Sequence, residues 1–484
     1  MNDQSTVPTK SLYARRESVF PKAVDGRFRR LKWFVMAVTL TVYYVTPWLR
    51  WDRGPYSPDQ AVLVDLAHRR FYFGPVEIWP HEFYYVAGLL IMAGIGLFLV
   101  TSAVGRAWCG YACPQTVWTD VFQHIERWVD GDRNAQIRLA EAPWTIGKLL
   151  RRGLKMAIFL LVSLATGGAW IFYFADAPTL AHELLRGEAP YVAYATVGVL
   201  TATTFVLGGF LREQVCIYMC PWPRIQTAML DEKSLIVTYK DWRGEPRGKG
   251  RRTATLADVV PLGDCIDCNQ CVAVCPTGID IRNGPQIGCI TCALCIDACD
   301  AVMAKIGKPR GLIDYATLDD CKREAAGGAP RSVLKTILRP RTLAYFSLWS
   351  AVGLGMAAAL ADRSRIDISA QHDRNPRYVQ LSDGDVRNDY MIKVRNMEGR
   401  PREAELAIAG LDGARLWTQG GSREDAGTSL RTTIPADALA KVPIFVAAPG
   451  GGREHEDVRF TVRVLESGET DSVEAKFERP EGAR

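Results

Sequence analysis

Five apolar blocks, separated by charged segments, constrain the fold of this chain more than any other feature. A helix that crosses a bilayer needs about 20 consecutive, mostly apolar residues. Core helices of a large soluble protein are the alternative, but Trp, Tyr, Lys and Arg around the blocks favour membrane spans. The sequence therefore predicts a multi-domain membrane protein with a five-span α-helical bundle. The predicted spans are Leu31–Trp48, Phe83–Val104, Met156–Ala175, Tyr191–Leu211 and Leu343–Ala361.

Lysine and arginine are unevenly distributed around these blocks, which predicts the orientation of the chain. Residues 1–32 hold eight basic and three acidic residues, and residues 105–155 hold eight and five. Because cytoplasmic loops carry the excess of basic residues, both segments are assigned to the cytoplasmic side of a bacterial inner membrane. Five crossings then place residues 1–30 and 212–341 in the cytoplasm and residues 365–484 in the periplasm. Anionic lipid beside the spans accounts for the net charge of +6 without a nucleic-acid partner.

The distribution of cysteine agrees with this topology. All 13 cysteines lie in segments assigned to the cytoplasm, and the periplasmic tail has none. Disulfides form in oxidising compartments, whereas clustered cysteines in a reducing compartment are typical of metal or redox sites. The sequence therefore predicts metal or redox chemistry on the cytoplasmic side of the membrane.

Two cysteine runs, CIDCNQCVAVCP and CITCALCIDACD, carry the strongest functional signal. Their spacing, C-x2-C-x2-C-x3-C, is that of bacterial two-cluster ferredoxins, in which the fourth cysteine of each run ligates the other cluster. Structural zinc is the alternative, but zinc sites usually have two separated CxxC pairs. The two runs differ in one respect, because Pro276 follows the first and Asp300 follows the second. We predict a ferredoxin-like α+β module at about residues 258–312 with two [4Fe-4S] clusters, one held by Cys265, Cys268, Cys271 and Cys299, and the other by Cys289, Cys292, Cys295 and Cys275.

The motif CxxxCP occurs twice, as CGYACP from Cys109 and as CIYMCP from Cys216, at positions that differ by 107. On a continuing helix, residues i and i+4 share a face, so the two thiols of each motif should point together before the proline ends the helix. Pairing of the two repeats would gather four soft thiols, which favour Cu(I), zinc or iron-sulfur centres. Packing residues left by a duplication, or a dithiol relay that exchanges disulfides, are the alternatives. The predicted catalytic and copper-binding residues are Cys109, Cys113, Cys216 and Cys220.

Three isolated side chains are predicted to be structural rather than ligating. His124 lies within two helical turns of the first CxxxCP motif, where a lone histidine on an amphipathic segment usually packs. Cys321 stands apart from the other cysteines and is expected to be inert. His372, in the sequence HDRNP, is expected to lie in a turn.

The tail at 365–484 has the pattern of a β-domain. The stretches YMIKVRN, EAELAIAG, VPIFVAA and VRFTVRVLE alternate or run apolar over strand lengths, with Gly, Asp and Pro between them. About 115 residues of short strands predict a sandwich of two sheets. Because this domain lacks cysteine, docking of a partner or a stabilising role is expected rather than a thiolate site.

The order of these parts resembles one known family. The two CxxxCP motifs, the double ferredoxin run continuing as VMAKIGKPRGLIDY, a final span and the stretch HDRNPRYVQLSDGDVRNDY together resemble the CcoG family, also called FixG or RdxA. The resemblance covers nearly the whole chain. It implies an immunoglobulin-like fold for the periplasmic domain. It also implies a role in assembly of cbb3-type cytochrome oxidase, a haem-copper enzyme, through reduction of Cu(II) to Cu(I).

The working hypothesis is a membrane iron-sulfur oxidoreductase that reduces copper for oxidase assembly. Its expected partners are an unidentified electron donor, copper ions, oxidase assembly factors or copper transporters, and membrane lipid. One rival is an electron conduit from a cytoplasmic or quinol donor to another redox protein, like the membrane ferredoxins of nitrate respiration that share CxxxCP. The other is a copper-holding scaffold without redox activity. The expected domains are residues 1–30, the four-helix region 31–211, the ferredoxin region 212–341, the fifth span 342–361 and the β-domain 365–484.

Overall fold

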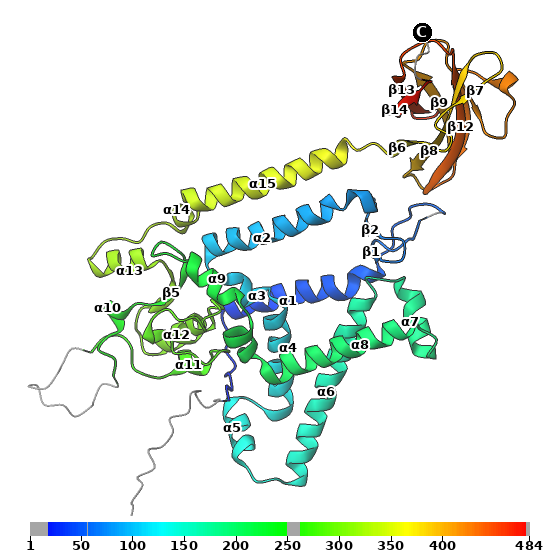
Figure 1. The fold of residues 1–484 in the computed structure, drawn as a ribbon. Coiled ribbons are helices and arrows are strands. Elements are labelled where there is room, and N and C mark those ends of the chain that lie inside the picture. Colours follow the sequence, from blue (N-terminus) through cyan, green and yellow to red (C-terminus); the bar gives the residue numbers. More distant parts are fainter. Residues whose placement is uncertain (1–17, 56, 249–261, 481–484) are drawn as a thin grey trace, which may run out of the picture. The chain divides into compact units, whose positions relative to one another are not determined.

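The computed structural model describes residues 18–55, 57–248 and 262–480. The chain folds into two compact units (Figure 1). The first unit contains the long helices and the ferredoxin module, up to Leu354. The second contains the β-domain that follows Gly355, together with the short segments Arg50–Ala61 and Gly74–Val76. The first four residues of the predicted ferredoxin range, 258–261, lie outside the described residues.

The first unit is built around helices that run from α1 to α9 and end with α15. Between α1 and α2 lies a small antiparallel sheet, β1-β2-β3, formed by Val62–Asp65, Arg70–Phe73 and Val76–Ile78. The helices are α1 Arg27–Val45, α2 Tyr84–Val104, α3 Ala107–Tyr111, α4 Pro114–Asp130, α5 Arg133–Glu141, α6 Ile146–Ile171, α7 Ala177–Arg186, α8 Tyr191–Thr204, α9 Trp222–Met229 and α15 Pro340–Ala361, with short turns η1 Thr46–Trp48 and η2 Pro80–Glu82.

Four helical segments among the described residues are long and apolar enough to cross a membrane. They are α2, α6, α8 together with the π-helical turn η3 (Phe205–Leu211), and α15. The first predicted span also forms a helix, α1, but its first six residues include Arg27, Arg29, Arg30 and Lys32. This charge leaves a short apolar stretch, so the fifth crossing and the orientation derived from it remain predictions. Helix α6 begins ten residues before the predicted start, Met156, because Thr145 caps it there by accepting a hydrogen bond from the Lys148 N–H.

Close contacts fix two pairs of these helices. In α6, a Cβ on Gly167 would lie 2.9 Å from the Val197 carbonyl of α8, so a small residue permits the close approach. Helices α2 and α15 lie side by side (Figure 1). The Trp349 indole donates to the Met92 carbonyl at 3.1 Å, and the Ser102 and Thr342 hydroxyls are 2.8 Å apart.

Buried charges join α1, α4 and α6. Arg29 pairs with Asp120 at 2.8 Å, and Lys155 pairs with Asp130 at 2.6 Å. Burial alone would raise the pKa of Asp120, but Lys32 and Arg29 hold it below its usual range. Since removal of one partner would leave an uncompensated buried charge, these pairs fix how the amphipathic helix α4 sits.

The ferredoxin module follows α9 and begins before the predicted boundary at residue 258. Its two strands, β4 and β5, pair antiparallel and bring together the two ends of the module. Asp297, on the helix between the two strands, accepts hydrogen bonds from the Phe28 and Arg29 N–H groups, and so caps the start of α1. The elements are β4 Ile236–Tyr239, α10 Asp241–Gly244, α11 Gln270–Ala273, η5 Ile281–Asn283, α12 Leu294–Lys305, β5 Ile313–Ala316, α13 Leu318–Ala325 and α14 Val333–Ile337.

The second unit is a sandwich of two antiparallel sheets. One sheet has the order β10-β12-β8-β6, with β7 also paired to β8, and the other has the order β11-β9-β13-β14. Along β8, buried residues alternate strictly with partly exposed ones, which places one face of the sheet in the core. The strands are β6 Ile366–His372, β7 Val379–Gln380, β8 Val386–Asn396, β9 Arg402–Ala409, β10 Arg415–Thr418, β11 Ser429–Ile434, β12 Ala438–Ala448, β13 His455–Val464 and β14 Thr470–Glu478.

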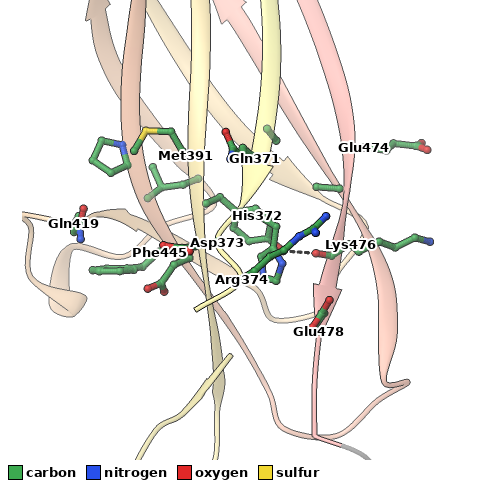
Figure 2. Close-up of a pocket in the computed structure, with 16 residues that line it drawn as sticks. Gln371, His372, Asp373, Arg374, Met391, Gln419, Phe445, Glu474, Lys476 and Glu478 are labelled. Atoms are coloured by element: carbon green, nitrogen blue, oxygen red, sulfur yellow. Dashed lines mark hydrogen bonds between the residues drawn. The ribbon is translucent and has the colours of Figure 1, made fainter. Parts of the chain in front are cut away.

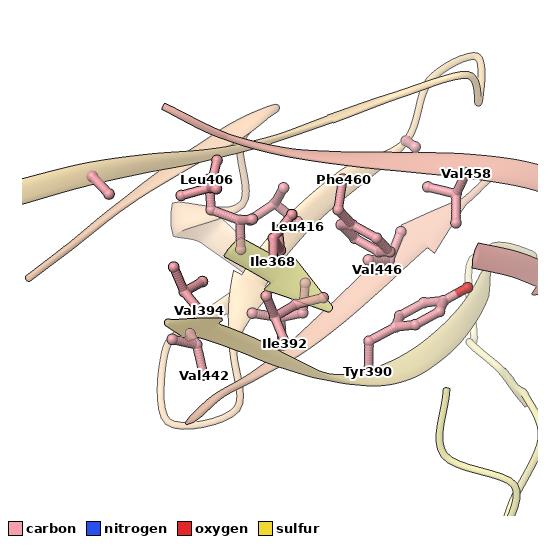
Figure 3. Close-up of a cluster of buried hydrophobic side chains, with 14 of the residues drawn as sticks. Ile368, Tyr390, Ile392, Val394, Leu406, Leu416, Val442, Val446, Val458 and Phe460 are labelled. Carbon is pink, nitrogen blue, oxygen red and sulfur yellow. The ribbon is translucent and has the colours of Figure 1, made fainter. Parts of the chain in front are cut away.

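Aliphatic side chains from both sheets fill the space between them (Figure 3). Phe460 is fully buried, and the ring of Tyr390 lies 5.0 Å from it. The predicted β-sandwich is therefore present. His372 is the last residue of β6 rather than part of a turn, and the turn follows it at Asn375.

Candidate functional site

The eight cysteines of the two ferredoxin runs line two neighbouring cavities in the module. One cavity is lined by Cys265, Cys268, Cys271 and Cys299. The other is lined by Cys275, Cys289, Cys292 and Cys295, and Cys271 borders it as well. The cavities thus group the thiols into the two predicted sets, with the fourth cysteine of each run crossing to the other set.

The backbone of both loops is shaped for a sulfur-rich group. Asp267, Asn269, Thr291 and Ala293 all have positive φ, between 50° and 60°. This conformation is strained for residues with a Cβ, above all for β-branched Thr291. Alternation of left- and right-handed residues turns successive N–H groups inward, and such nests occur at many iron-sulfur sites.

N–H groups of the second loop point at the sulfur atoms. Burial raises the pKa of Cys289, and the Thr291 N–H opposes this shift. Burial likewise raises the pKa of Cys292 to about 12, and the Leu294 N–H opposes it. Four thiols on each cavity, inward N–H groups and strained loops fit a [4Fe-4S] cluster in each.

A partly buried arginine supports the first loop. Arg282 pairs with Asp280 at 2.7 Å and with Asp267 at 2.6 Å, and it also donates to the Asn269 side chain. Burial raises the pKa of Cys271, and the positive charge of Arg282 opposes that shift. Arg282 therefore holds the strained loop and places a positive charge beside the first cavity.

The two CxxxCP motifs form the same backbone arrangement. In each, a long helix ends at a residue with positive φ, Gly105 at 63° or Arg212 at 44°, and these positions also differ by 107. The first cysteine then lies in a short helix, Cys109 in α3 and Cys216 in the π-helical turn η4 (Val215–Met219). The proline after the second cysteine begins or precedes the next helix, α4 or α9.

The expectation of a continuing helix through each motif is wrong. Cys113 has φ −59° and ψ 128°, and Cys220 has φ −77° and ψ 123°, so both are extended. Proline disfavours helical geometry at the residue before it, and here that residue is the second cysteine itself. The helix therefore ends inside the motif, and its two thiols do not share one helical face.

The four motif thiols nevertheless occupy one neighbourhood. Burial raises the pKa of Cys109 to about 11, Arg106 opposes that shift, and Cys113 and Cys220 add to it. Burial raises the pKa of Cys216 to about 12, and the other three motif thiols add to that shift. The other three thiols therefore lie close enough to Cys216 for their charges to affect its pKa.

Gln226 links the two repeats. The Cys109 thiol donates to the Gln226 side-chain oxygen at 3.1 Å, and the Gln226 amide donates to the Thr101 hydroxyl at 3.0 Å. Gln226 is fully buried on α9, just after the second motif. Within residues 18–55, 57–248 and 262–480, no three His, Cys, Asp or Glu side chains are close enough together to hold a single ion. A copper ion held by three or four of these thiols would therefore require the thiols to move closer together.

The isolated side chains lie where packing explains them. The His124 ring meets the Trp33 ring edge-on at 4.9 Å. Cys321 is buried on α13 and lines neither cysteine cavity. Sequence reasoning missed Arg106, Gln226 and Arg282, because nothing in their local pattern shows that they turn toward cysteines distant in sequence.

An open cavity of about 910 Å³ lies on the β-domain (Figure 2). It is bordered by β6, β8, β12 and β14, and His372 and Met391 are among its lining residues. The His372 ring packs 5.0 Å from the Tyr390 ring, and the Tyr390 hydroxyl donates to the Lys476 carbonyl at 2.8 Å. No cysteine lines this cavity, so it offers no thiolate site.

Comparisons with known proteins agree with this division of the chain. Residues 86–132 match a 4Fe-4S binding domain, and residues 211–318 match a 4Fe-4S dicluster domain. Residues 356–480 match the IG-like fold at the C-terminal end of FixG. The immunoglobulin-like fold implied by the resemblance is therefore confirmed.

Three curated relatives are similar over nearly their whole length. The nitrogen fixation protein FixG of Rhizobium meliloti is 52% identical over 98% of this chain and 94% of its own. Protein RdxB of Cereibacter sphaeroides is 56% identical over 95% of this chain and 96% of its own. Protein RdxA of the same organism is 54% identical over 92% of both chains.

Proposed function

Because this chain belongs to the FixG and RdxA family of membrane iron-sulfur proteins, we propose that it reduces Cu(II) to Cu(I) at the four CxxxCP thiols. The Cu(I) would serve assembly of the copper centre of a cbb3-type cytochrome oxidase. An unidentified donor would supply the electrons. Because the protein would pass them to Cu(II), it would act as a cupric reductase.

Eight thiols of the ferredoxin module are the proposed ligands of two [4Fe-4S] clusters. The proposed sets are Cys265, Cys268, Cys271 and Cys299, and Cys275, Cys289, Cys292 and Cys295. When bound, the clusters store and release single electrons. The chain holds the ligand loops in their strained conformation, keeps the thiols away from water and directs N–H groups at the sulfur atoms.

One observation supports electron transfer between the ferredoxin module and the motif thiols. Cys109 packs in the same buried cluster as Cys292, with Cys295 at its border. A motif thiol and two proposed cluster ligands are thus separated by side chains rather than by solvent. This contact supports electron transfer between the two sets of cysteines.

The motif thiols suit the product of the reaction. Soft thiolates bind Cu(I) in preference to harder ions. Each Cu(II) takes up one electron, and each thiol that binds the resulting Cu(I) must release its proton. Cys109, Cys113, Cys216 and Cys220 would therefore both make the reduction of Cu(II) more favourable and hold the cuprous product until transfer.

The proposed setting is the bacterial inner membrane. The N-terminal segment and the ferredoxin module face the cytoplasm, and the β-domain faces the periplasm, as the Lys and Arg distribution predicts. The β-domain would then dock oxidase assembly factors or copper transporters, since it has no thiol with which to bind copper itself.

Two sets of variants separate this proposal from its rivals. Cys268→Ala with Cys292→Ala removes one ligand from each cluster, and Cys113→Ala with Cys220→Ala removes half of the motif thiols. We expect the first pair to retain Cu(I) binding but to lose Cu(II) reduction, and the second pair to retain the clusters but to lose both copper functions. Cys321→Ala serves as the control and should change neither.

Other outcomes would favour the rivals. A copper-holding scaffold would bind copper, and the parent protein with reduced clusters would form no Cu(I). An electron conduit would leave Cu(II) unchanged but would reduce a quinone or a redox protein. The readouts are bound iron, cluster absorbance and Cu(I) captured by a chromogenic chelator under anaerobic conditions.

A further inference from the structure

The first CxxxCP motif touches the backbone of the second ferredoxin run. Gly110, the residue after Cys109, has no room for a side chain. A Cβ at this position would lie 2.7 Å from the Ile290 carbonyl and 3.0 Å from the Cys292 nitrogen. Contacts below about 3 Å do not occur without a shift, so glycine allows α3 to rest directly on the loop that holds Cys292.

Two tyrosine hydroxyls form hydrogen bonds with the backbone of this loop. The Tyr111 hydroxyl donates to the Cys292 carbonyl at 3.1 Å, and the Tyr315 hydroxyl donates to the Thr291 carbonyl at 2.5 Å. Tyr111 is buried and Tyr315 is partly buried. Thr291 and Ala293 are the residues with strained, positive φ, so these hydrogen bonds act where the loop most needs support.

The neighbours of Gly110 and Tyr111 extend the contact. The Arg106 guanidinium, buried at the start of α3, donates to the Ile287 carbonyl at 2.5 Å. Cys109 packs with Ile290 and Cys292. The short helix α3 and Arg106 before it therefore contact the segment from Ile287 to Cys292, which includes the start of the second ferredoxin run.

The second motif lacks this contact, although the repeat aligns the residues. Ile217 stands where the first motif has Gly110, and Tyr218 stands where it has Tyr111. Tyr218 is 68% exposed and Met219 is 58% exposed. The Tyr218 hydroxyl forms no hydrogen bond with any residue that the structure describes. The two motifs thus differ. Gly110 and Tyr111 of the first rest on the module, whereas Tyr218 and Met219 of the second are exposed, although Cys216 borders a small cavity that Ile290 of the module also lines.

We propose that electrons enter the thiol site through the first CxxxCP motif, and that Gly110 and Tyr111 are positioning residues that hold this motif against the backbone of Cys292. The second motif, whose Tyr218 and Met219 are exposed, is then the side at which copper arrives. This inference rests on the proposed function for the identity of the acceptor. One electron leaves the module and one Cu(II) becomes Cu(I), and no atom or proton moves across the contact.

The test compares two matched tyrosine variants in the full-length protein with its clusters. Tyr111→Phe removes one hydroxyl at the contact, and Tyr218→Phe removes the corresponding hydroxyl of the second motif. Four properties are measured: bound iron, the electron paramagnetic resonance spectrum of the reduced clusters, hydrogen exchange of the segment from Ile287 to Leu294, and the rate at which Cu(II) reoxidises the clusters.

Tyr111→Phe is expected to retain its iron and to lose exchange protection in that segment by about five- to tenfold, because a buried carbonyl loses its partner. The spectrum of one cluster should change, and reoxidation by Cu(II) should slow several-fold. Tyr218→Phe should match the parent protein in all four properties. Gly110→Ala is expected to cause a larger effect in the same direction, with Gly147→Ala as control because a Cβ on Gly147 meets open space.

Parent-like exchange, spectra and rates in Tyr111→Phe would overturn the inference. Equal slowing in Tyr111→Phe and Tyr218→Phe would also overturn it, because the two motifs would then be equivalent. If the parent protein forms no Cu(I), the proposed function fails. Exchange and spectra then decide whether Tyr111 positions the loop of Cys292, since neither depends on copper.

Discussion

At the scale of single residues, charge beside the cysteines sets their chemistry. Arg282 contacts the first ferredoxin loop and lies on the cavity of Cys265, Cys268, Cys271 and Cys299. A nearby positive charge favours the reduced, more negative form of a cluster. We therefore expect this arginine to raise the reduction potential of the first cluster and to stabilise the loop.

Arg282→Gln should lower the potential of one cluster by on the order of tens of millivolts, while the other cluster changes less. Redox titration followed by electron paramagnetic resonance measures this shift. Arg310→Gln is the control, because Arg310 is an exposed residue of the same module. Unchanged potentials in Arg282→Gln, or an equal shift in both variants, would contradict this role.

The raised pKa values of Cys109 and Cys216, about 11 and about 12, predict how copper binding depends on pH. Below those values each thiol carries a proton that Cu(I) must displace. Apparent Cu(I) affinity should therefore rise with pH, by about tenfold per unit for each proton released. Competition with a Cu(I) chelator at about pH 6.5 and 7.5, corrected for protonation of the chelator, measures the change. An affinity that stays constant would exclude these thiols as the ligands.

Sequence spacing predicted which cysteines group together in the module, because loop spacing is local and the fourth cysteine follows the known ferredoxin pattern. The roles of Gly110 and Tyr111 could not be predicted in the same way. Their partners lie about 180 residues away, and Tyr111 and Tyr218 are identical in type. The differences between Gly110 and Ile217 and between Ala112 and Met219 were the signals within the motifs that the repeats are unequal.

At the scale of helices, the direction of each CxxxCP motif depends on the turn that joins it to the preceding long helix. Gly105 has φ 63°, and a Cβ there would lie 2.5 Å from the Leu235 carbonyl. The second repeat uses Arg212 at the same position, in a conformation that is strained for a residue with a side chain. Arg212 forms an ion pair with Glu126 and donates to the Gly209 carbonyl, which offsets this strain.

Gly105→Ala should destabilise the first unit by roughly 1–3 kcal/mol, because both the backbone conformation and the contact with Leu235 are unfavourable for alanine. Thermal unfolding of the detergent-solubilised protein, with bound iron as a second readout, measures this loss. Gly147→Ala, in an open position near the start of α6, should be neutral or slightly stabilising. Equal melting temperatures for the two variants would refute this reading of the turn.

Apolar content located the candidate spans and most of their ends, but not the start of α6. The start of α6 depends on the Thr145 cap, which is not visible in hydropathy. The fourth span ends at Leu211 as predicted, but its last turn is the π-helical η3. The sequence prediction continued the helix through the second cysteine of each motif. Proline instead prevents helical geometry at the residue before it, so the helix ends before Cys113 and before Cys220.

At the scale of the whole molecule, one compact unit holds both the membrane helices and the ferredoxin module. The sequence predicted these parts as separate domains. It could not show that α1 is capped by Asp297, or that α3 rests on the second run, because both contacts join segments far apart in the chain. In the proposed function, this joined unit is what would let electrons pass between the two sets of cysteines.

The central claim is that the CxxxCP thiols receive electrons from the module and deliver them to copper. Protein reduced with dithionite and freed of excess reductant is mixed anaerobically with Cu(II) and a Cu(I) chelator, while cluster absorbance is followed. We predict one Cu(I) for each electron lost, and slowing by about tenfold or more when Cys109, Cys113, Cys216 and Cys220 are replaced by alanine. Clusters that stay reduced without Cu(I), or a variant that reoxidises at the parent rate, would contradict the claim.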